Sequence, residues 1–160
     1  MLSMIIGKKF NRISRAADMF CLFLGEDYVF TSSIGTRVNV AEYALHFQTQ
    51  WRFREGKEIF LAARDIYEPL NPDTPEDWQC DAGGSVFDVR VALLAEKMRE
   101  STVEDVQFSD ANDLIIRFSN GVVLEQFTPT SVKDEEWRLI DYENNLHIVC
   151  YDENGNIVQA

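Results

Sequence analysis

Residues 45–53 read L-H-F-Q-T-Q-W-R-F, and this alternation is the strongest structural signal in the chain. A period of two residues is typical of a β-strand with one face on a core and the other toward water. Residues 43–54 are therefore predicted to form one strand, whose inward side chains are Leu45, Phe47, Thr49, Trp51 and Phe53. A tight turn at residues 55–56 would return the chain along residues 58–67 as the partner strand of a hairpin.

A second Trp-Arg pair begins the run W-R-L-I-D-Y at residues 137–142. A turn at residues 143–145 joins this run to a further apolar strand at residues 146–151, which predicts another hairpin. Neighbouring side chains of a strand point to opposite faces. Both tryptophans are therefore predicted to be buried, and both arginines to lie outside the apolar core: Trp51, Trp137, Arg52 and Arg138.

Three further strands and a short last one are predicted from apolar runs and turn signals. Asn120-Gly121 separates residues 113–119 from residues 122–127, and both turn residues tolerate positive φ, which favours a hairpin. Residues 103–108 lead into that hairpin, and Asn154-Gly155 allows a short last strand over residues 156–159.

The first third of the chain is less clearly patterned. Residues 5–20 leave a short helix and an irregular strand both open, because their apolar spacing is roughly helical but Ser and Asn weaken it. Residues 19–25 read as a buried strand that ends at Gly25, and residues 28–35 as a second strand.

One helix is predicted over residues 85–99. Ser85 stands three residues before Asp88, a spacing that satisfies free N–H groups at a helix start. An apolar stripe follows at helical spacing, formed by Phe87, Val91, Leu94 and Met98. The preceding residues 68–84 hold three prolines within seven positions and predict a surface loop. Together these elements predict a single α+β domain over residues 1–160, an antiparallel β-rich rolled sheet or half-barrel with one firm helix packed against it.

The net charge is −12, and it is unevenly distributed. Residues 1–67 hold nine Lys or Arg against seven Asp or Glu, whereas residues 68–160 hold six against twenty. Such a balance disfavours nucleic acid as a partner, because phosphates repel carboxylates. It favours a cationic protein partner that the electrostatic field attracts, although solubility alone also explains it.

The sequence predicts a reducing, cytoplasmic location. Its three cysteines form no C-x-x-C pair, and Cys21 and Cys150 stand in apolar runs as expected for buried free thiols. The N-terminal apolar run is too short for a signal peptide, and no run approaches the length of a membrane span, so no membrane partner is expected.

No catalytic residue, metal ligand or cofactor is predicted. His46 and His147 are the only histidines, and no carboxylate or cysteine stands near either at a spacing that indicates a metal or acid–base site. The adjacent acids Asp134, Glu135 and Glu136 are typical of a solvated turn. No calcium loop, phosphate-binding glycine loop or nucleophile elbow occurs.

Two interpretations of Arg52 and Arg138 are open. Each arginine can pair with an acid on a neighbouring strand, which is the common case. Alternatively both arginines line a shared polar surface with Asp65 and Tyr67 and bind a carboxylate or phosphate through their planar guanidinium groups.

Four segments resemble a family of small, largely uncharacterised bacterial α+β proteins. They are E-Y-A-L-H-F-Q-T-Q-W-R-F at 42–53, A-A-R-D-I-Y-E-P at 62–69, F-S-N-G-V-V-L-E-Q-F at 118–127 and E-E-W-R-L at 135–139. The resemblance covers roughly residues 5–150 and implies no catalytic residue. Some similar small acidic proteins are immunity proteins that neutralise toxins, so the resemblance implies an immunity-like role by analogy.

The leading hypothesis is a non-enzymatic, immunity-like interaction protein whose acidic C-terminal half binds a cationic partner. The turn at Asp134, Glu135 and Glu136 is expected to border that contact. A second hypothesis is a small-ligand binder or enzyme that uses Arg52, Asp65 and Arg138, and a third is a homodimer paired through an edge strand. A deep pocket lined by those three residues would favour the second, and a flat acidic surface the first.

Overall fold

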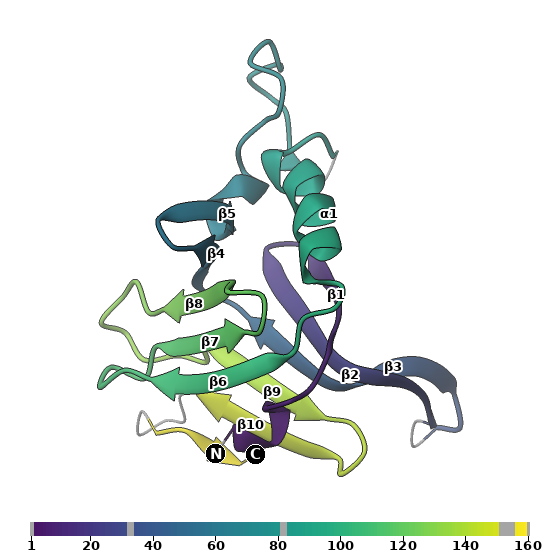
Figure 1. Ribbon diagram of the computed structural model, residues 1–160. Helices are drawn as coiled ribbons and strands as arrows, with labels where there is room; N and C mark the ends of the chain where they lie inside the picture. Colours follow the sequence, from purple (N-terminus) through teal and green to yellow (C-terminus); the bar gives the residue numbers. More distant parts are fainter. Residues whose placement is uncertain (1, 32–33, 81–82, 151–155, 160) are drawn as a thin grey trace.

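A computed structural model describes residues 2–31, 34–80, 83–150 and 156–159, which form two open antiparallel sheets and one α-helix (Figure 1). The first sheet has the order β1-β2-β3-β9-β10-β11, and the second has the order β5-β4-β8-β7-β6. This arrangement confirms the predicted β-rich α+β fold with one helix packed on it. The first sheet consists of β1 (Phe10–Ala16), β2 (Met19–Thr31), β3 (Arg37–Phe47), β9 (Trp137–Asp141), β10 (Leu146–Cys150) and β11 (Val158–Gln159). The second consists of β4 (Gln50–Glu55), β5 (Glu58–Ala62), β6 (Val103–Phe108), β7 (Leu114–Phe118) and β8 (Val123–Phe127).

The predicted single strand over residues 43–54 is wrong, because the chain changes sheets in its middle. β3 ends at Phe47 in the first sheet, and β4 begins at Gln50 in the second. The alternation continues through the break, and Phe47 and Trp51 are both buried between the sheets. A pattern of period two reports which face of the chain is buried, and it contains no information on which strand lies alongside.

Gly25 does not end a strand, as the sequence predicted, but lies within the long strand β2. The pairing of β2 with β3 shifts between Leu24 and Asp27, so the strand is bulged there. Gly25 has φ +83°, and a Cβ atom at this position would lie 2.8 Å from Cβ of Glu42. Only glycine tolerates both the positive φ and this close approach.

Beyond the bulge, β2 and β3 continue as a two-stranded projection, which we call the arm: residues 27–31 paired with residues 37–41. The arm leaves the body of the molecule at the right of Figure 1. Residues 28–31 therefore extend β2 rather than forming a separate strand. At the other end of β2, residues 10–16 form strand β1, which settles the choice between helix and strand there.

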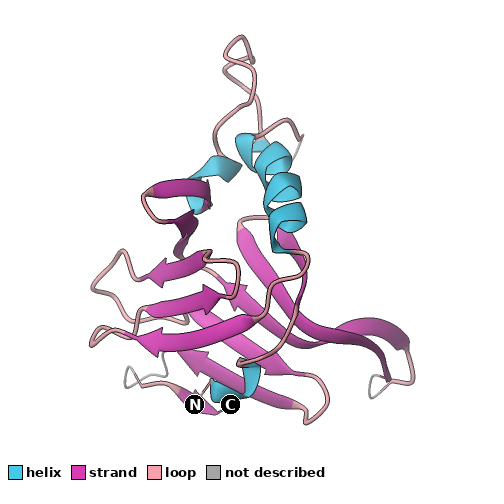
Figure 2. Ribbon diagram, viewed as in Figure 1, coloured by secondary structure: helices cyan, strands magenta, loops and turns pink. Residues whose placement is uncertain are grey.

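The helix α1 (Val86–Met98) begins at the predicted cap. Ser85 accepts a hydrogen bond from the Asp88 N–H, and the Asp88 carboxylate accepts one from the Ser85 N–H. Phe87, Leu94 and Met98 are buried, and Val91 packs partly buried against them, which confirms the stripe. The loop that precedes α1 extends outward beyond the N-terminal end of the helix, as expected for a surface loop (Figure 2). Two short 3₁₀ helices, η1 (Ser3–Ile5) and η2 (Ala63–Ile66), complete the elements.

Each of the two strand tryptophans joins the sheets across the core. Trp51 on β4 stacks on Phe20 of β2 with a centroid distance of 4.1 Å. Trp137 on β9 stacks on Phe108 of β6 with a centroid distance of 5.8 Å. Both tryptophans are at most 1% exposed, which confirms their predicted burial, and their neighbouring arginines lie outside the apolar core.

The two later hairpin predictions and the predicted last strand have different outcomes. The hairpin of β7 and β8 is confirmed, but only Gly121 of its Asn-Gly pair has positive φ. Gly121 N–H donates to the Phe118 carbonyl and Phe118 N–H to the Val122 carbonyl, so the loop holds three residues rather than two. The hairpin of β9 and β10 is confirmed, and β11 pairs with β10, whereas Asn154-Gly155 lies outside the described residues.

Two other sequence predictions concern the cysteines and the membrane. Cys21 is a buried free thiol, as predicted, and the side chain of Cys150 lies outside the described residues. Among the described residues, no helix has the length and apolar character needed to cross a membrane.

Candidate functional site

The two arginines of the predicted polar surface lie on different sheets and take partners from the chain. Arg52 on β4 lies opposite Glu125 on β8, and its Nε donates to that carboxylate at 2.6 Å. Arg54 donates to the same carboxylate at 2.7 Å. Burial opposes ionisation of Glu125, but the hydrogen bonds from Arg54 and Arg52 outweigh it and lower the pKa of Glu125. The cross-strand interpretation is confirmed for Arg52, and Arg138 instead pairs with nearby Glu135 at 2.7 Å.

Asp65 and Tyr67 also make their polar contacts within the chain. The Asp65 carboxylate accepts a hydrogen bond from the Ala62 N–H at the start of η2. The Tyr67 hydroxyl donates to Asp18 at 3.2 Å. Within the described part of the chain, no hydrogen bond or ion pair joins Arg52, Arg138, Asp65 and Tyr67 to one another. The structure therefore gives each of these residues a separate local role.

The acidic turn before Trp137 comes together with Arg138 around a hollow of about 450 Å³, where the chain passes from β3 to β4. Its three acids differ in environment. The Glu135 carboxylate binds Arg138, and Asp134 accepts a hydrogen bond from the Glu135 N–H. Glu136 is only 4% exposed, and burial raises its pKa against the opposing hydrogen bond from Thr49. Of the three acids in this turn, therefore, not all present their negative charge to solvent.

Of the two histidines, His46 lies beside the buried free thiol of Cys21. His46 lies opposite Cys21 on one side and Arg138 on the other, all on neighbouring strands of the first sheet. Burial, and then the charge of Arg138, lower the pKa of His46, while burial raises the pKa of the Cys21 thiol. A thiol with a raised pKa is a poor nucleophile. No group of three His, Cys, Asp or Glu side chains among the described residues could hold a metal ion.

A second acidic region was not foreseen from the sequence. Glu26, Asp27, Tyr28, Glu42 and Glu143 surround a hollow of about 250 Å³ at the base of the arm, which we call the acidic hollow. The hydrogen bond from the Tyr142 N–H to the Glu42 carbonyl, at 3.1 Å, holds β9 beside β3 and brings Glu143 to this site. Three of the four acids come from the first third of the chain, so the charge comes from both halves.

Two of the acids in the acidic hollow have cationic partners, and two do not. Lys8 binds Glu42 at 2.8 Å, and Arg12 binds Asp27 at 2.9 Å. Glu26 and Glu143 are exposed, and neither forms an ion pair with any residue that the structure describes. The acidic hollow therefore carries negative charge that the chain itself does not neutralise.

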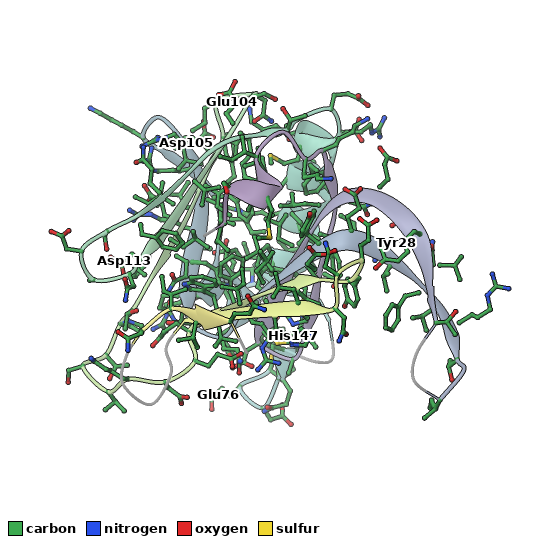
Figure 3. All side chains as sticks on the ribbon, turned by 90° about the horizontal axis from the view of Figure 1, so that it is seen from below. Tyr28, Glu76, Glu104, Asp105, Asp113 and His147 are labelled. Atoms are coloured by element: carbon green, nitrogen blue, oxygen red, sulfur yellow. The ribbon has the colours of Figure 1, made fainter. Side chains whose placement is uncertain are left out.

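Tyr28 lines the acidic hollow from the arm, and the acids around it affect its pKa. Burial, followed by the charges of Asp141 and Glu143, raises the pKa of Tyr28. Its hydroxyl is buried and has no hydrogen-bond partner among the described residues. Figure 3 shows Tyr28 on the arm, well separated from His147 on β10.

An apolar stripe runs along the arm beside the acidic hollow. Tyr28 lies opposite Val40 and Phe30 opposite Val38, so these four side chains share one face of the arm. The Phe30 ring packs at 5.8 Å from Tyr142, and Val38 is 43% exposed. The alternation of polar and apolar residues at 37–40 could have predicted this apolar face from the sequence. No sequence pattern could have predicted the acidic hollow, because its acids come from separate segments of the chain.

Comparison of the chain with protein-family models, with curated proteins and with solved structures gives no match. The family resemblance described for the four sequence segments therefore stays a prediction.

Proposed function

We propose that this protein is a non-enzymatic interaction domain that binds a cationic protein partner at the acidic hollow and along the apolar stripe of the arm. The observation that supports the proposal best is that Glu26 and Glu143 form no ion pair with a cation of the described chain, whereas the two other acids of the acidic hollow do. A protein with net charge −12 attracts cationic surfaces over about a Debye length, roughly 8 Å at physiological salt.

The two parts of this surface would contribute differently to binding. A lysine or arginine side chain of the partner would enter the acidic hollow and bind Glu26 and Glu143. Apolar side chains beside it would cover Phe30 and Val38 on the arm. Exposed charges mainly raise the association rate, whereas buried apolar contacts lower the dissociation rate.

The proposal places the contact at the acidic hollow rather than at the turn before Trp137. Glu135 in that turn is already paired with Arg138, and Glu136 is buried. The alternative role as a ligand binder or enzyme has less support, because Arg52 and Asp65 are engaged by Glu125 and by the Ala62 N–H. A narrower form of the proposal, in which the partner is a cationic toxin, depends on the analogy with immunity proteins.

The test is capture of partners from a lysate of the source organism, with quantitative mass spectrometry. The variant carries Glu26→Lys and Glu143→Lys, and the control carries the same charge change on β6 as Glu104→Lys and Asp105→Lys. Glu104 and Asp105 lie away from Tyr28 (Figure 3). We expect a cationic protein that the wild type and the control retain and the variant loses.

Stopped-flow association with the captured partner then tests the electrostatic part. Higher salt should lower the association rate far more than it raises the dissociation rate. Equal capture by the wild type and the Glu26, Glu143 variant would contradict the proposal, as would an association rate that does not depend on salt.

A further inference from the structure

A second concave surface lies between strand β5 and helix α1, remote in sequence from the acidic hollow. It has a volume of about 380 Å³ and is lined by Glu58, Ile59 and Phe60 of β5 and by Arg90, Leu93 and Lys97 of α1. We call it the β5–α1 groove. Ile59 is 46% exposed and Leu93 is 68% exposed, so apolar surface is accessible on both of its walls.

The β5–α1 groove follows the unpaired edge of a sheet. β5 is the terminal strand of the second sheet, and among the described strands only β4 pairs with it. Successive side chains of a strand point to opposite faces, so a groove lined by the three consecutive residues 58–60 must lie along the edge between the faces. An exposed strand edge presents N–H and C=O groups that can pair with another strand.

Phe60 shows that this edge can accept a hydrogen bond from outside the sheet. The pairing of β5 with β4 passes from Leu61 directly to Ile59, so Phe60 has no partner on β4. Its carbonyl accepts a hydrogen bond from Arg90 Nη1 at 3.4 Å. A hydrogen bond of this length is weak, and a backbone N–H at normal distance would replace it favourably.

We propose that the β5–α1 groove binds an extended peptide segment of another protein, which pairs with the edge of β5 as an added strand and presents an acidic side chain to Arg90. Arg90 is exposed, and it forms no ion pair with the residues that the structure describes. A guanidinium group without an ion-pair partner favours a segment that presents a carboxylate to it. Lys97 lies 4.9 Å from the Phe60 ring centroid but is paired with Glu55, so Arg90 is the cation that an acidic side chain would meet.

The charge of the groove argues for an acidic peptide rather than a second copy of the chain. Figure 1 shows α1 beside β5, so a second copy would bring its own α1 with a second Arg90 to the same edge. Like charges that face one another across paired strands repel. An isolated strand carries no such helix. Its backbone would supply affinity, and alternate apolar side chains would contact Ile59 and Leu93.

The test uses blocked heptapeptides and nuclear magnetic resonance of the labelled protein. The first peptide alternates glutamate with an apolar residue, which is varied among valine, isoleucine, leucine and phenylalanine. A second set replaces glutamate with lysine, and a third carries N-methyl groups on alternate amides of the first set. We expect amide shifts at residues 58–60 and 90–97 with the first set, and binding weaker by about tenfold or more with the other two.

Two charge-reversal variants complete the experiment. Arg90→Glu should weaken binding of the acidic peptides by about tenfold or more, and Arg117→Glu, the same exchange at an exposed position of β7, should not change it. Absence of shifts in the groove, equal binding of the N-methylated set, or an unchanged affinity in Arg90→Glu would overturn the proposal. A homodimer that Arg90→Glu dissociates in sedimentation would also overturn it, because the groove would then be a self-association surface.

Discussion

Glu136 is a buried acid directly before the core residue Trp137. Its side chain loses most of its water on folding, and a hydrogen bond with Thr49 replaces that water only in part. The charges of Asp134 and Asp113 further disfavour its ionised form. The raised pKa of Glu136 therefore means that the ionised side chain reduces the stability of the folded protein.

The pH dependence of stability should reveal this residue. Because the folded pKa of Glu136 is raised above its unfolded value, the folded protein binds this proton more tightly. Its contribution to stability is then fully present below the unfolded pKa and is lost as pH rises through the folded pKa. We expect Glu136→Gln to remove this loss, so that the variant gains stability relative to the wild type as pH rises above about 4.3, the unfolded pKa of glutamate.

Urea denaturation at several pH values measures the effect, and the exposed acid Glu104 provides the control. Glu104→Gln should follow the wild-type pH dependence. If the difference between Glu136→Gln and the wild type is the same at every pH, Glu136 is not the source of the dependence.

At the scale of elements, helix α1 packs one of its faces against the core, and two adjacent leucines show which face that is. Leu94 is 2% exposed and packs in the core beneath the β5–α1 groove, whereas Leu93 is 68% exposed, although both line that groove. Adjacent helical residues are about 100° apart around the axis, so only one of the two can face the sheets. The sequence stripe identified Leu94 correctly because its neighbours at helical spacing are also apolar.

Truncation of each leucine should therefore have very different effects. Leu94→Ala leaves a cavity in the core and should lower the free energy of unfolding by about 2–5 kcal/mol. Leu93→Ala removes the same atoms from an exposed position and should change it by less than about 0.5 kcal/mol. Chemical denaturation of both variants measures the difference. Similar losses in the two variants would mean that the helix is rotated about its axis from the orientation in the structure.

At the scale of the whole molecule, the N-terminal cations do not form a free basic patch. Lys8 binds Glu42, Lys9 binds Glu100 and Arg12 binds Asp27, at distances of 2.8 to 3.0 Å. Arg15 lies 4.0 Å from Asp88 at the start of α1. These four cations are close together in the sequence, and folding places an acid beside each of them.

We therefore expect no binding to duplex DNA at physiological salt, because the remaining surface is strongly acidic and repels phosphates. Fluorescence polarisation with a labelled duplex measures this up to high micromolar protein. A control variant with Glu42→Gln, Asp27→Asn and Glu100→Gln frees three of these cations and should bind more strongly than the wild type at low salt. Micromolar binding by the wild type at physiological salt would contradict the expectation.

The sequence by itself determined which faces are buried and where the helix begins. The alternation at residues 45–53, the Ser85 cap with Asp88, and the stripe that includes Leu94 are all local patterns. Such patterns depend on the geometry of a single element, because side chains repeat every two residues in a strand and about every 3.6 residues in a helix. They placed the buried tryptophans and leucines correctly without knowledge of their neighbours.

Only the tertiary structure decided how the elements pair, and with that the candidate sites. The passage of the chain between sheets after Phe47 and the course of β2 through Gly25 depend on which strand lies alongside. The acidic hollow joins Glu26, Glu42 and Glu143, which meet because β2, β3 and β9 are neighbours in one sheet. The β5–α1 groove exists because β5 is left at an edge beside the helix. Pairing over such sequence separations depends on the energy of the whole core, and no local pattern records it.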